Sequence, residues 1–168
     1  MAIVSSAAAG LRVASRATIV QLRAPGLSTA MLEKEANELV GAVSVPVLIS
    51  SRCDVVLAAG AAGVNLPEND VSVADAKTLL GTRLVGRSVH SIPSAQQAER
   101  EGADFVIFGP VWESASHQDI HPVGLAALAQ MVRSVGIPVL AIGGVTDERV
   151  TEVLASGAAG YAAIRLFA

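Results

Sequence analysis

Short apolar segments alternate with longer amphipathic segments along the whole chain, and this alternation constrains the fold more than any other feature. The apolar segments are mostly continuous runs of β-forming residues, which is typical of strands covered on both faces in a parallel sheet. Seven strands are predicted, near residues 18–23, 45–50, 63–67, 83–90, 105–111, 138–143 and 160–167. Helices are predicted before and between them, over residues 2–17, 28–42, 54–59, 73–80, 94–102, 125–135 and 146–157.

Regular alternation of this kind predicts the α/β class and a (β/α) barrel of the TIM type. Seven strands are one fewer than a complete barrel has, so this interpretation leaves one strand unaccounted for. An open, doubly wound sheet is the alternative. No Gly-x-Gly-x-x-Gly motif follows the first predicted strand, which argues against that alternative.

Chain length and composition argue against several classes of protein, including nucleic-acid-binding and membrane-spanning proteins. With 52% hydrophobic residues, residues 1–168 are expected to form one globular domain. A net charge of -3, 3% aromatic residues and the lack of a basic run argue against nucleic-acid binding. The single cysteine, Cys53, excludes an internal disulfide. No apolar run approaches the length of a membrane span, and the protein is expected to be cytoplasmic with no membrane partner.

Polar residues and glycines stand at the ends of the predicted strands, where a barrel places its active face. His90 shares a strand face with Gly86 and Ser88, and a histidine can accept and return a proton near neutral pH. The other interpretation of His90 is a packed or hydrogen-bonded residue at a strand end. The remaining strand-end residues are Gln21, Arg23, Ser50, Ser51, Arg52, Asn65, Gly109, Gly143, Gly144 and Arg165.

These strand ends favour an anionic small molecule as the ligand, because three of them are arginines in a chain of negative net charge. Gly143 and Gly144 precede a predicted helix that Thr146 or Asp147 would cap. Glycines let backbone N–H groups approach an anion, and barrels commonly hold phosphate in the loops after their last two strands. A phosphate pocket is therefore predicted where those loops begin, at Gly143 and Ile164.

No metal site is predicted from the residues themselves. His117 and His121 are four apart, but they lie in a loop interrupted by Pro122, and no glutamate follows His117. Paired carboxylates are also absent from the strand ends.

Segments spread over nearly the whole chain resemble, in order, the thiamine-phosphate synthase/thiazole tautomerase superfamily. They are Gln21-Leu22-Arg23, Gly86-Arg87-Ser88-Val89-His90-Ser91, Ala103-Asp104-Phe105 through Gly109-Pro110-Val111, Pro122-Val123-Gly124-Leu125 and Ala141-Ile142-Gly143-Gly144-Val145-Thr146. The segment ending in His90-Ser91 resembles the tautomerase (TenI-type) branch. So does Asn65-Leu66-Pro67, which replaces the synthase pattern His-x-Gly-Gln. The resemblance implies a barrel that binds a thiazole phosphate at the C-terminal ends of its strands.

The tautomerase branch implies a cofactor-free isomerase of thiamine biosynthesis that aromatises a thiazole phosphate carboxylate by proton transfer. His90 would be the acid and base. The backbone of Gly143, Gly144 and Ile164, next to Arg165, would hold the phosphate, and Arg23 or Arg52 the substrate carboxylate. The other substrate-binding residues that the resemblance implies are Gln21, Ser50, Asn65, Ser88 and Gly109.

Two alternatives remain open. One is thiamine-phosphate synthase, a Mg²⁺-dependent transferase that joins a pyrimidine diphosphate to the thiazole phosphate, with Asp70 as a metal ligand. Against it, Ser50-Ser51 replaces the synthase's Asn-Asp, and Pro25 and His117 stand where it has lysines, so groups that neutralise a departing diphosphate are missing. The other alternative is a phosphate-ligand binding protein without catalysis.

Alignment with the superfamily places residues 2–17 at its first helix, so the first strand and the last helix are expected to be absent. The strands at 160–167 and 18–23 would then be open edges, covered by residues 1–17 or by a neighbouring chain. Members of this superfamily are often oligomeric, so a homo-oligomer is also expected.

Overall fold

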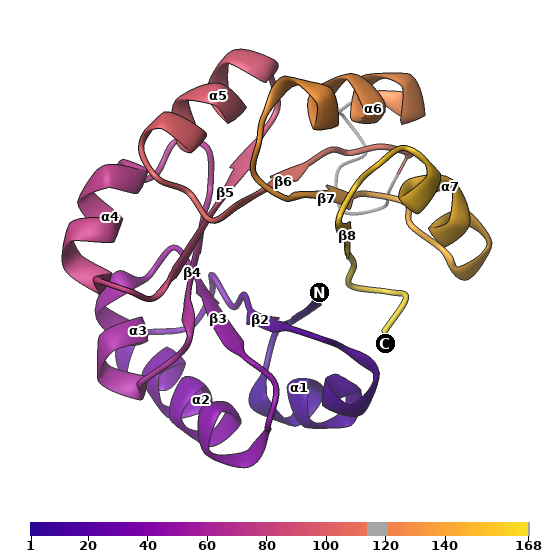
Figure 1. Ribbon diagram of the computed structural model, residues 1–168. Coiled ribbons are helices and arrows are strands. Elements are labelled where there is room, and N and C mark those ends of the chain that lie inside the picture. The colour runs from indigo at the N-terminus through magenta and orange to yellow at the C-terminus, as the bar shows by residue number, and fades with distance from the viewer. Residues whose placement is uncertain (114–120, 168) are drawn as a thin grey trace.

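The computed structural model describes residues 1–113 and 121–167 and contains one parallel eight-stranded sheet whose strands follow chain order (Figure 1). The strands are β1 Ala2–Val4, β2 Val20–Leu22, β3 Val47–Ser50, β4 Gly63–Leu66, β5 Leu84–Val89, β6 Phe105–Phe108, β7 Val139–Ile142 and β8 Gly160–Ala162. The helices are α1 Ala7–Val13, α2 Thr29–Ala42, α3 Cys53–Ala59, α4 Val73–Leu80, α5 Ile92–Arg100, α6 Gly124–Ser134 and α7 Val150–Ala155. Two short 3₁₀ helices, η1 Ala14–Arg16 and η2 Asp147–Arg149, precede β2 and α7. The α/β barrel predicted from the alternation is confirmed.

The expectation that the first strand is absent was wrong. Ala2–Val4 forms β1, and it pairs in parallel with β2 in the register Ile3 opposite Gln21. The sequence pattern favours a helix here because Ile3 matches the helical spacing of the alanines that follow, and a three-residue strand carries little pattern of its own. The helix begins only at Ala7, where the Ser6 side chain accepts a hydrogen bond from the Ala9 N–H and caps it.

The open edge expected between the first and last strands is bridged. Ala2 and Ala163 form a parallel bridge just beyond the end of β8. The Ile3 N–H donates to the Ala163 carbonyl at 2.9 Å, and the Ala163 N–H donates to the Met1 carbonyl at 3.1 Å. These bonds bring both ends of the described chain to one side of the ring (Figure 1). The barrel is therefore eight-stranded and nearly closed, and covering by residues 1–17 or by a second chain is not needed to explain it.

No helix follows β8 among the described residues, which extend to Phe167. Helix α5 also begins earlier than predicted. Ser91, rather than Ser94, is its N-cap, and Ser94 completes the capping box from the third helical position. None of the described helices is long and apolar enough to cross a membrane.

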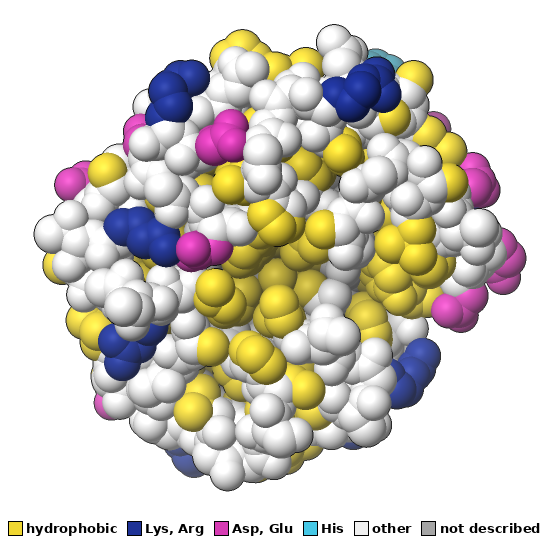
Figure 2. All heavy atoms as spheres, in the orientation of Figure 1, with side chains coloured by type: hydrophobic (Ala, Val, Ile, Leu, Met, Phe, Trp, Pro, Cys, Tyr) yellow, Lys and Arg dark blue, Asp and Glu magenta, His cyan; other side chains and the backbone are white. Residues whose placement is uncertain are grey.

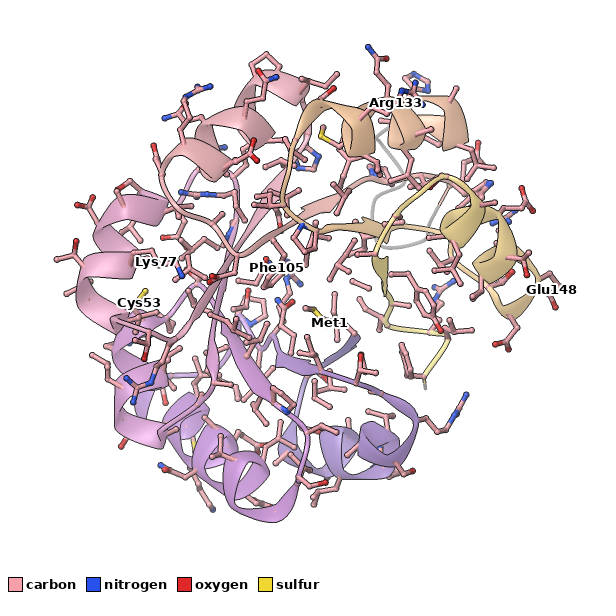
Figure 3. All side chains as sticks on the ribbon, viewed as in Figure 1. Met1, Cys53, Lys77, Phe105, Arg133 and Glu148 are labelled. Carbon is pink, nitrogen blue, oxygen red and sulfur yellow. The ribbon has the colours of Figure 1, made fainter. Side chains whose placement is uncertain are left out.

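Two apolar clusters build the core. The larger one packs the helices against the outside of the sheet and includes Leu22, Leu39 and Leu128. The smaller one consists of Met1, Ile3, Leu48, Phe105, Ile107 and Ala162. Met1 and Phe105 point into the centre of the ring (Figure 3), and hydrophobic side chains gather in the middle of the face in Figure 2. The interior of the barrel is therefore apolar beneath the polar side chains at the C-terminal ends of the strands.

Candidate functional site

A cavity of about 300 Å³ opens where β5, β6, β7 and β8 end. Six of the predicted site residues line it, namely His90, Gly109, Gly143, Gly144, Ile164 and Arg165. The other lining residues are Pro110, Glu113, Ile142, Val145, Thr146, Arg149, Ala162 and Ala163. The structure thus brings together the predicted acid/base residue and all four predicted phosphate-binding residues.

His90 follows β5 directly and is fixed on two sides. Its ring Nδ1 lies 2.9 Å from the Gly109 carbonyl oxygen, at the end of β6. A carbonyl only accepts hydrogen bonds, so Nδ1 carries the proton and Nε2 is the basic nitrogen of the neutral ring. The backbone N–H of His90 donates to the Glu68 carboxylate at 3.1 Å. Among the described residues Nε2 has no hydrogen-bond partner, which leaves both the acid/base role and the alternative of a hydrogen-bonded strand-end residue open.

Glu68 comes from the loop after β4 and reaches across to β5. Partial burial alone would raise the pKa of Glu68, but hydrogen bonds from Ser94 and from the His90 N–H lower it, as do the nearby charges of His90 and Arg87. The net effect is a pKa below the usual range for a glutamate. Glu68 is therefore a carboxylate that holds the His90 backbone in place.

Gly143 and Gly144 let two loops lie against each other. Both have left-handed backbone, with φ of 91° and 66°, and a Cβ on Gly144 would come within 2.6 Å of the Trp112 Cβ. The N–H groups of Val111 and Trp112 donate to the carbonyls of Ile142 and Gly143 at 2.8 and 3.1 Å. The double glycine is thus required for loop packing as well as for any approach of an anion.

The helix predicted after this loop begins differently from expected. Thr146 occupies the N-cap position, but its side chain makes no capping hydrogen bond. The turn that follows is η2, and α7 starts only at Val150. Capping by Thr146 or Asp147 was therefore wrong, because the first turn here is a 3₁₀ turn.

Arg149 and Glu113 line the cavity but were missed in the sequence. Arg149 was assigned to the helix at residues 146–157 without a role, since a charge in a surface helix ordinarily faces solvent. One feature of the sequence could have identified Arg149, namely its position in the first helical turn after the predicted phosphate loop. Its guanidinium donates to the Gly144 carbonyl at 2.7 Å and lies 4.9 Å from the centre of the Trp112 ring.

The predicted site residues on β2, β3 and β4 do not line this cavity. Gln21 and Asn65 are buried at the barrel mouth, and the Asn65 Nδ2 donates to the Ser88 hydroxyl on β5 at 3.0 Å. Gln21 Oε1 and Asn65 Oδ1 have no hydrogen-bond partner within residues 1–113 and 121–167. Ser50 ends β3 and is half-buried. This set is a separate polar group beside the cavity.

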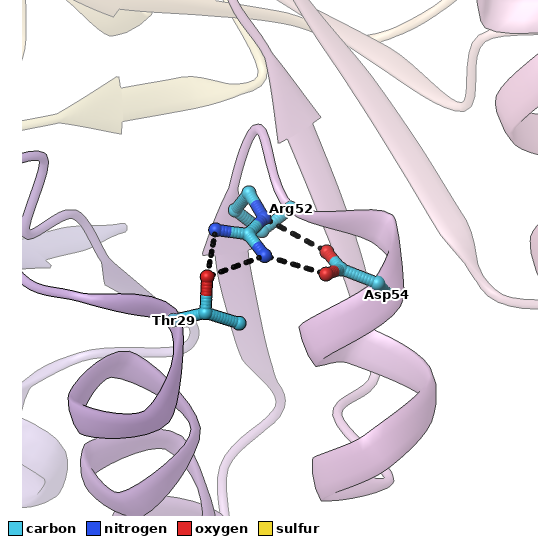
Figure 4. A network of polar contacts seen from close by, with 3 residues as sticks. All are labelled: Thr29, Arg52 and Asp54. Atoms are coloured by element: carbon cyan, nitrogen blue, oxygen red, sulfur yellow. Dashed lines mark hydrogen bonds and ion pairs between the residues drawn. The ribbon is translucent and has the colours of Figure 1, made fainter.

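Arg23 and Arg52, predicted to hold a substrate carboxylate, also lie outside the cavity lining. Arg23 is exposed just after β2. Arg52 pairs with Asp54 at 2.5 Å and also donates to the Thr29 hydroxyl at 3.1 Å (Figure 4). The hydrogen bond from Arg52 lowers the pKa of Asp54. Arg52 is thus already engaged by a carboxylate of its own chain.

Asp70, the predicted metal ligand of the synthase interpretation, has both carboxylate oxygens engaged. Oδ2 accepts a hydrogen bond from the Ser51 hydroxyl, and Oδ1 accepts one from the Val71 N–H at 2.8 Å. Among the described residues, no three His, Cys, Asp or Glu side chains gather into a metal-binding group. Because Mg²⁺ is commonly held by one or two carboxylates together with substrate phosphates, Asp70 could contribute one carboxylate to such a site, without the second one of the synthase pattern. His117 lies outside the described residues.

Comparison of the sequence with protein-family models identifies a family for the chain. The family model described as thiamine monophosphate synthase matches residues 2–167. The chain belongs to this family. Within the thiamine monophosphate synthase family, a putative thiamine-phosphate synthase 2 from Aquifex aeolicus is 39% identical over 152 residues, 89% of this chain and 82% of that protein. A thiamine-phosphate synthase from Methanoculleus marisnigri is 40% identical over 164 residues, 93% of this chain and 76% of that protein.

Among solved structures, the thiamine phosphate pyrophosphorylase from Pyrococcus furiosus superposes with a TM-score of 0.88 at 30% identity. The match covers 97% of this chain and 83% of that one. The thiamine monophosphate synthase family member described here is therefore an enzyme of thiamine biosynthesis. The names of these relatives support the synthase alternative better than the tautomerase interpretation drawn from the sequence.

Proposed function

We propose that the enzyme binds a thiazole phosphate in the cavity at β5–β8 and that His90 moves a proton on the bound ring. The reaction is that of a thiazole tautomerase, an isomerase. The observation that carries the proposal is the place of His90. Its ring is tied through Nδ1 to Gly109, on the rim of the same cavity that Gly143, Gly144 and Ile164 line.

Two features of His90 suit it to a proton transfer. With Nδ1 donating to a carbonyl, the tautomer is fixed and Nε2 is the base that takes a proton from the ring system. The protonated imidazole can then return a proton at a second ring position, so one residue performs both steps. The reaction needs no oxidant or reductant, because one proton is removed from the ring system and one is returned to it.

The phosphate fits the other end of the cavity. Backbone N–H groups near Gly143, Gly144 and Ile164 can donate to its oxygens, and Arg165 supplies positive charge. The cavity of about 300 Å³ is at the small end of the range for small-molecule sites. Holding the phosphate there places the reacting ring toward His90.

The second candidate is thiamine-phosphate synthase, and the names of the relatives favour it. That reaction releases a diphosphate, and its departing charge must be neutralised by Mg²⁺ and basic residues. In this chain Ser51 stands where one metal-binding carboxylate is expected, and Asp70 is hydrogen-bonded by Ser51 and Val71. The missing carboxylate, and the Pro25 and His117 that replace the synthase's lysines, support the proton transfer against the synthase.

The test is aromatisation of the non-aromatic thiazole phosphate carboxylate, followed by ultraviolet absorbance or NMR. We expect the wild-type enzyme to accelerate it, and His90→Asn to lower kcat by about 10²–10⁴-fold while substrate affinity changes little. His121→Asn is the matched control, because His121 is an exposed histidine outside the cavity lining. An unchanged rate in His90→Asn would refute the role of His90.

A second assay separates the alternatives. The enzyme is given a pyrimidine diphosphate and the aromatic thiazole phosphate, with and without Mg²⁺, and released diphosphate is measured. Diphosphate release that requires Mg²⁺, without aromatisation activity, would replace the tautomerase proposal with the synthase. Tight binding of the thiazole phosphate with neither activity would leave the non-catalytic ligand-binding protein.

A further inference from the structure

Arg149 is the cavity residue whose position the proposed proton transfer does not explain. It ends η2, immediately after the Gly143-Gly144 loop, and its side chain returns toward that loop. One guanidinium nitrogen, Nη1, donates to the Gly144 carbonyl at 2.7 Å. The guanidinium carbon lies 4.9 Å from the centre of the Trp112 ring, in the range of a cation–π contact. An arginine fixed in this way has lost most of its rotamer freedom before any ligand arrives.

The fixed guanidinium has capacity left for a ligand. A guanidinium carries five N–H donors, and within the described residues the one hydrogen bond that Arg149 makes uses Nη1. Arg149 forms no ion pair with a carboxylate of the described chain. The Trp112 ring lies against one side of the guanidinium, and among the described residues the remaining N–H donors have no hydrogen-bond partner. An anion can therefore be bound through those donors.

The charges around the cavity favour an anion there. Among the described residues, Arg149 and Arg165 are the two permanent cations of the lining, and Glu113 is its one acidic residue. A phosphate monoester carries close to two negative charges at neutral pH, which two guanidinium groups can balance. Arg149 shares the lining with Gly143 and Gly144, so it stands beside the backbone N–H groups that would hold a phosphate.

We propose that Arg149 is a phosphate-binding residue of this cavity, held ready by the Trp112 ring and the Gly144 carbonyl. The proposal rests on the proposed function only in placing a phosphate in the same cavity, and it holds for either reaction considered above. It also gives Trp112 a function, since removing the ring frees the guanidinium and lowers affinity without removing any direct contact to the ligand.

Trp112 is also a reporter for the test, because the chain contains one tryptophan. A ligand that recruits Arg149 changes the environment of the ring, so indole fluorescence follows binding directly. Inorganic phosphate is the probe, titrated near neutral pH, with isothermal calorimetry as an independent measure of Kd. Arg133→Met on α6 is the matched control, because Arg133 is an exposed arginine outside the cavity.

Arg149→Met is expected to weaken phosphate binding by about 10- to 100-fold, the loss of charge-assisted hydrogen bonds. Arg149→Lys keeps the charge without the planar fork and is expected to recover part of that loss. Trp112→Leu, measured by calorimetry, is expected to weaken binding a few-fold, and Trp112→Phe less, because phenylalanine keeps a ring under the guanidinium. Arg133→Met should match the wild type.

A purely structural Arg149, which only holds the Gly144 carbonyl, gives different results. Arg149→Met would then lower the unfolding midpoint, yet the folded variant would bind phosphate with unchanged Kd, and that result overturns the proposal. A wild-type enzyme that binds no phosphate also overturns it. Neither result decides the role of His90, since proton transfer is measured separately by turnover in His90→Asn.

Discussion

The two halves of the barrel mouth use polar residues in opposite ways. Around β5–β8 the polar groups converge on a cavity, and several of them are backbone N–H groups or a guanidinium with donors to spare. Around β2–β4 Ser51 donates to Asp70, and Asn65 donates across to Ser88 on β5. The Gln21 Oε1 and Asn65 Oδ1 atoms have no hydrogen-bond partner among the described residues. The position of a residue at a strand end is the same in both halves. For the arginines of the two halves, the difference is whether a carboxylate of the described chain already compensates the charge.

Arg52 and Arg149 show the difference most clearly. Both are arginines that immediately precede a helix, Arg52 before α3 and Arg149 at the end of η2 before α7, and both hydrogen-bond to their own chain. Arg52 is paired with the Asp54 carboxylate and a threonine hydroxyl, so its charge is compensated (Figure 4). Arg149 donates to a neutral carbonyl and stacks on a ring, so its charge is fixed in place without being neutralised. Three substitutions test whether this contrast holds.

The largest effect is expected for Gly144→Ala in the β5–β8 half. The new Cβ would lie 2.6 Å from the Trp112 Cβ and 2.7 Å from the Glu113 carbonyl oxygen, at a residue with φ of 66°. We expect a loss of about 1–3 kcal/mol of unfolding free energy, and weaker phosphate binding because the two loops must separate. Urea unfolding and a phosphate titration measure the two effects.

Gly41→Ala is the matched control for this substitution. Gly41 lies in α2, and a Cβ there meets nothing within 4 Å. Alanine should therefore be tolerated or raise stability by about 0.5–1 kcal/mol, with unchanged phosphate affinity. If Gly144→Ala behaved like Gly41→Ala, the two loops would not be packed as tightly as the contacts indicate.

Glu68→Gln gives an intermediate effect and probes the contact that joins the two halves. The Glu68 carboxylate, from the loop after β4, accepts the His90 N–H, and its pKa is lowered in the folded protein. A lowered pKa means that the carboxylate stabilises the fold fully above about pH 4.5, the value of an unfolded glutamate. This stabilisation is lost as the pH falls through the lower, folded pKa. Near neutral pH we expect the free energy of unfolding of the wild type to be about 1 kcal/mol larger than that of Glu68→Gln.

The measurement is the free energy of unfolding of both proteins between neutral pH and about pH 3. The difference between them should shrink as the pH falls below about 4.5. A difference that stays constant across that range would mean that the charge of Glu68 is not what stabilises the loop, and the link between the halves would then be steric.

The smallest effect is expected for Arg52→Ala in the β2–β4 half. The side chains of Arg52 and Asp54 are 36% and 61% exposed, so their pair is screened by water and contributes at most about 0.5 kcal/mol. Phosphate affinity should not change. If Arg52→Ala raised KM for the thiazole phosphate carboxylate tenfold or more, Arg52 would leave Asp54 to bind substrate, and the contrast with Arg149 would fail.

The sequence predicts most of this fold because its strands are strongly apolar and its helices are punctuated by glycine, proline and serine. Seven of the eight strands were placed within a few residues. The exception, Ala2–Val4, has three residues, and tertiary pairing with β2 and Ala163 rather than local pattern makes it a strand. The strands also end earlier than predicted, since Gly109 and Gly143 leave the sheet for loop contacts that no local pattern records.

The sequence predicted site residues whose location follows from the order of the strands. It did not predict which side chains a given residue contacts. Gly143, Gly144 and His90 could be placed from strand order alone, because a barrel gathers its strand ends on one face. The sequence predicts that Arg52 ends a strand and binds a substrate carboxylate, whereas it predicts Arg149 within a helix and without a role. Only the structure shows that one faces Asp54 and the other faces Trp112. The roles of these residues in binding and proton transfer remain predictions for the assays above.

The bonds that close the ring have a consequence for how the protein is made. The Met1 amino group donates to the Tyr161 carbonyl, a contact between residues 160 positions apart, and Ile3 and Ala163 bond beside it. Synthesis delivers residues at about 5–20 per second, so β1 leaves the ribosome many seconds before its second neighbour exists. During that interval β1 can pair on one side only. The nascent chain therefore carries an exposed strand edge until residue 163 has emerged, a period in which a chaperone or a second nascent chain can compete for that edge.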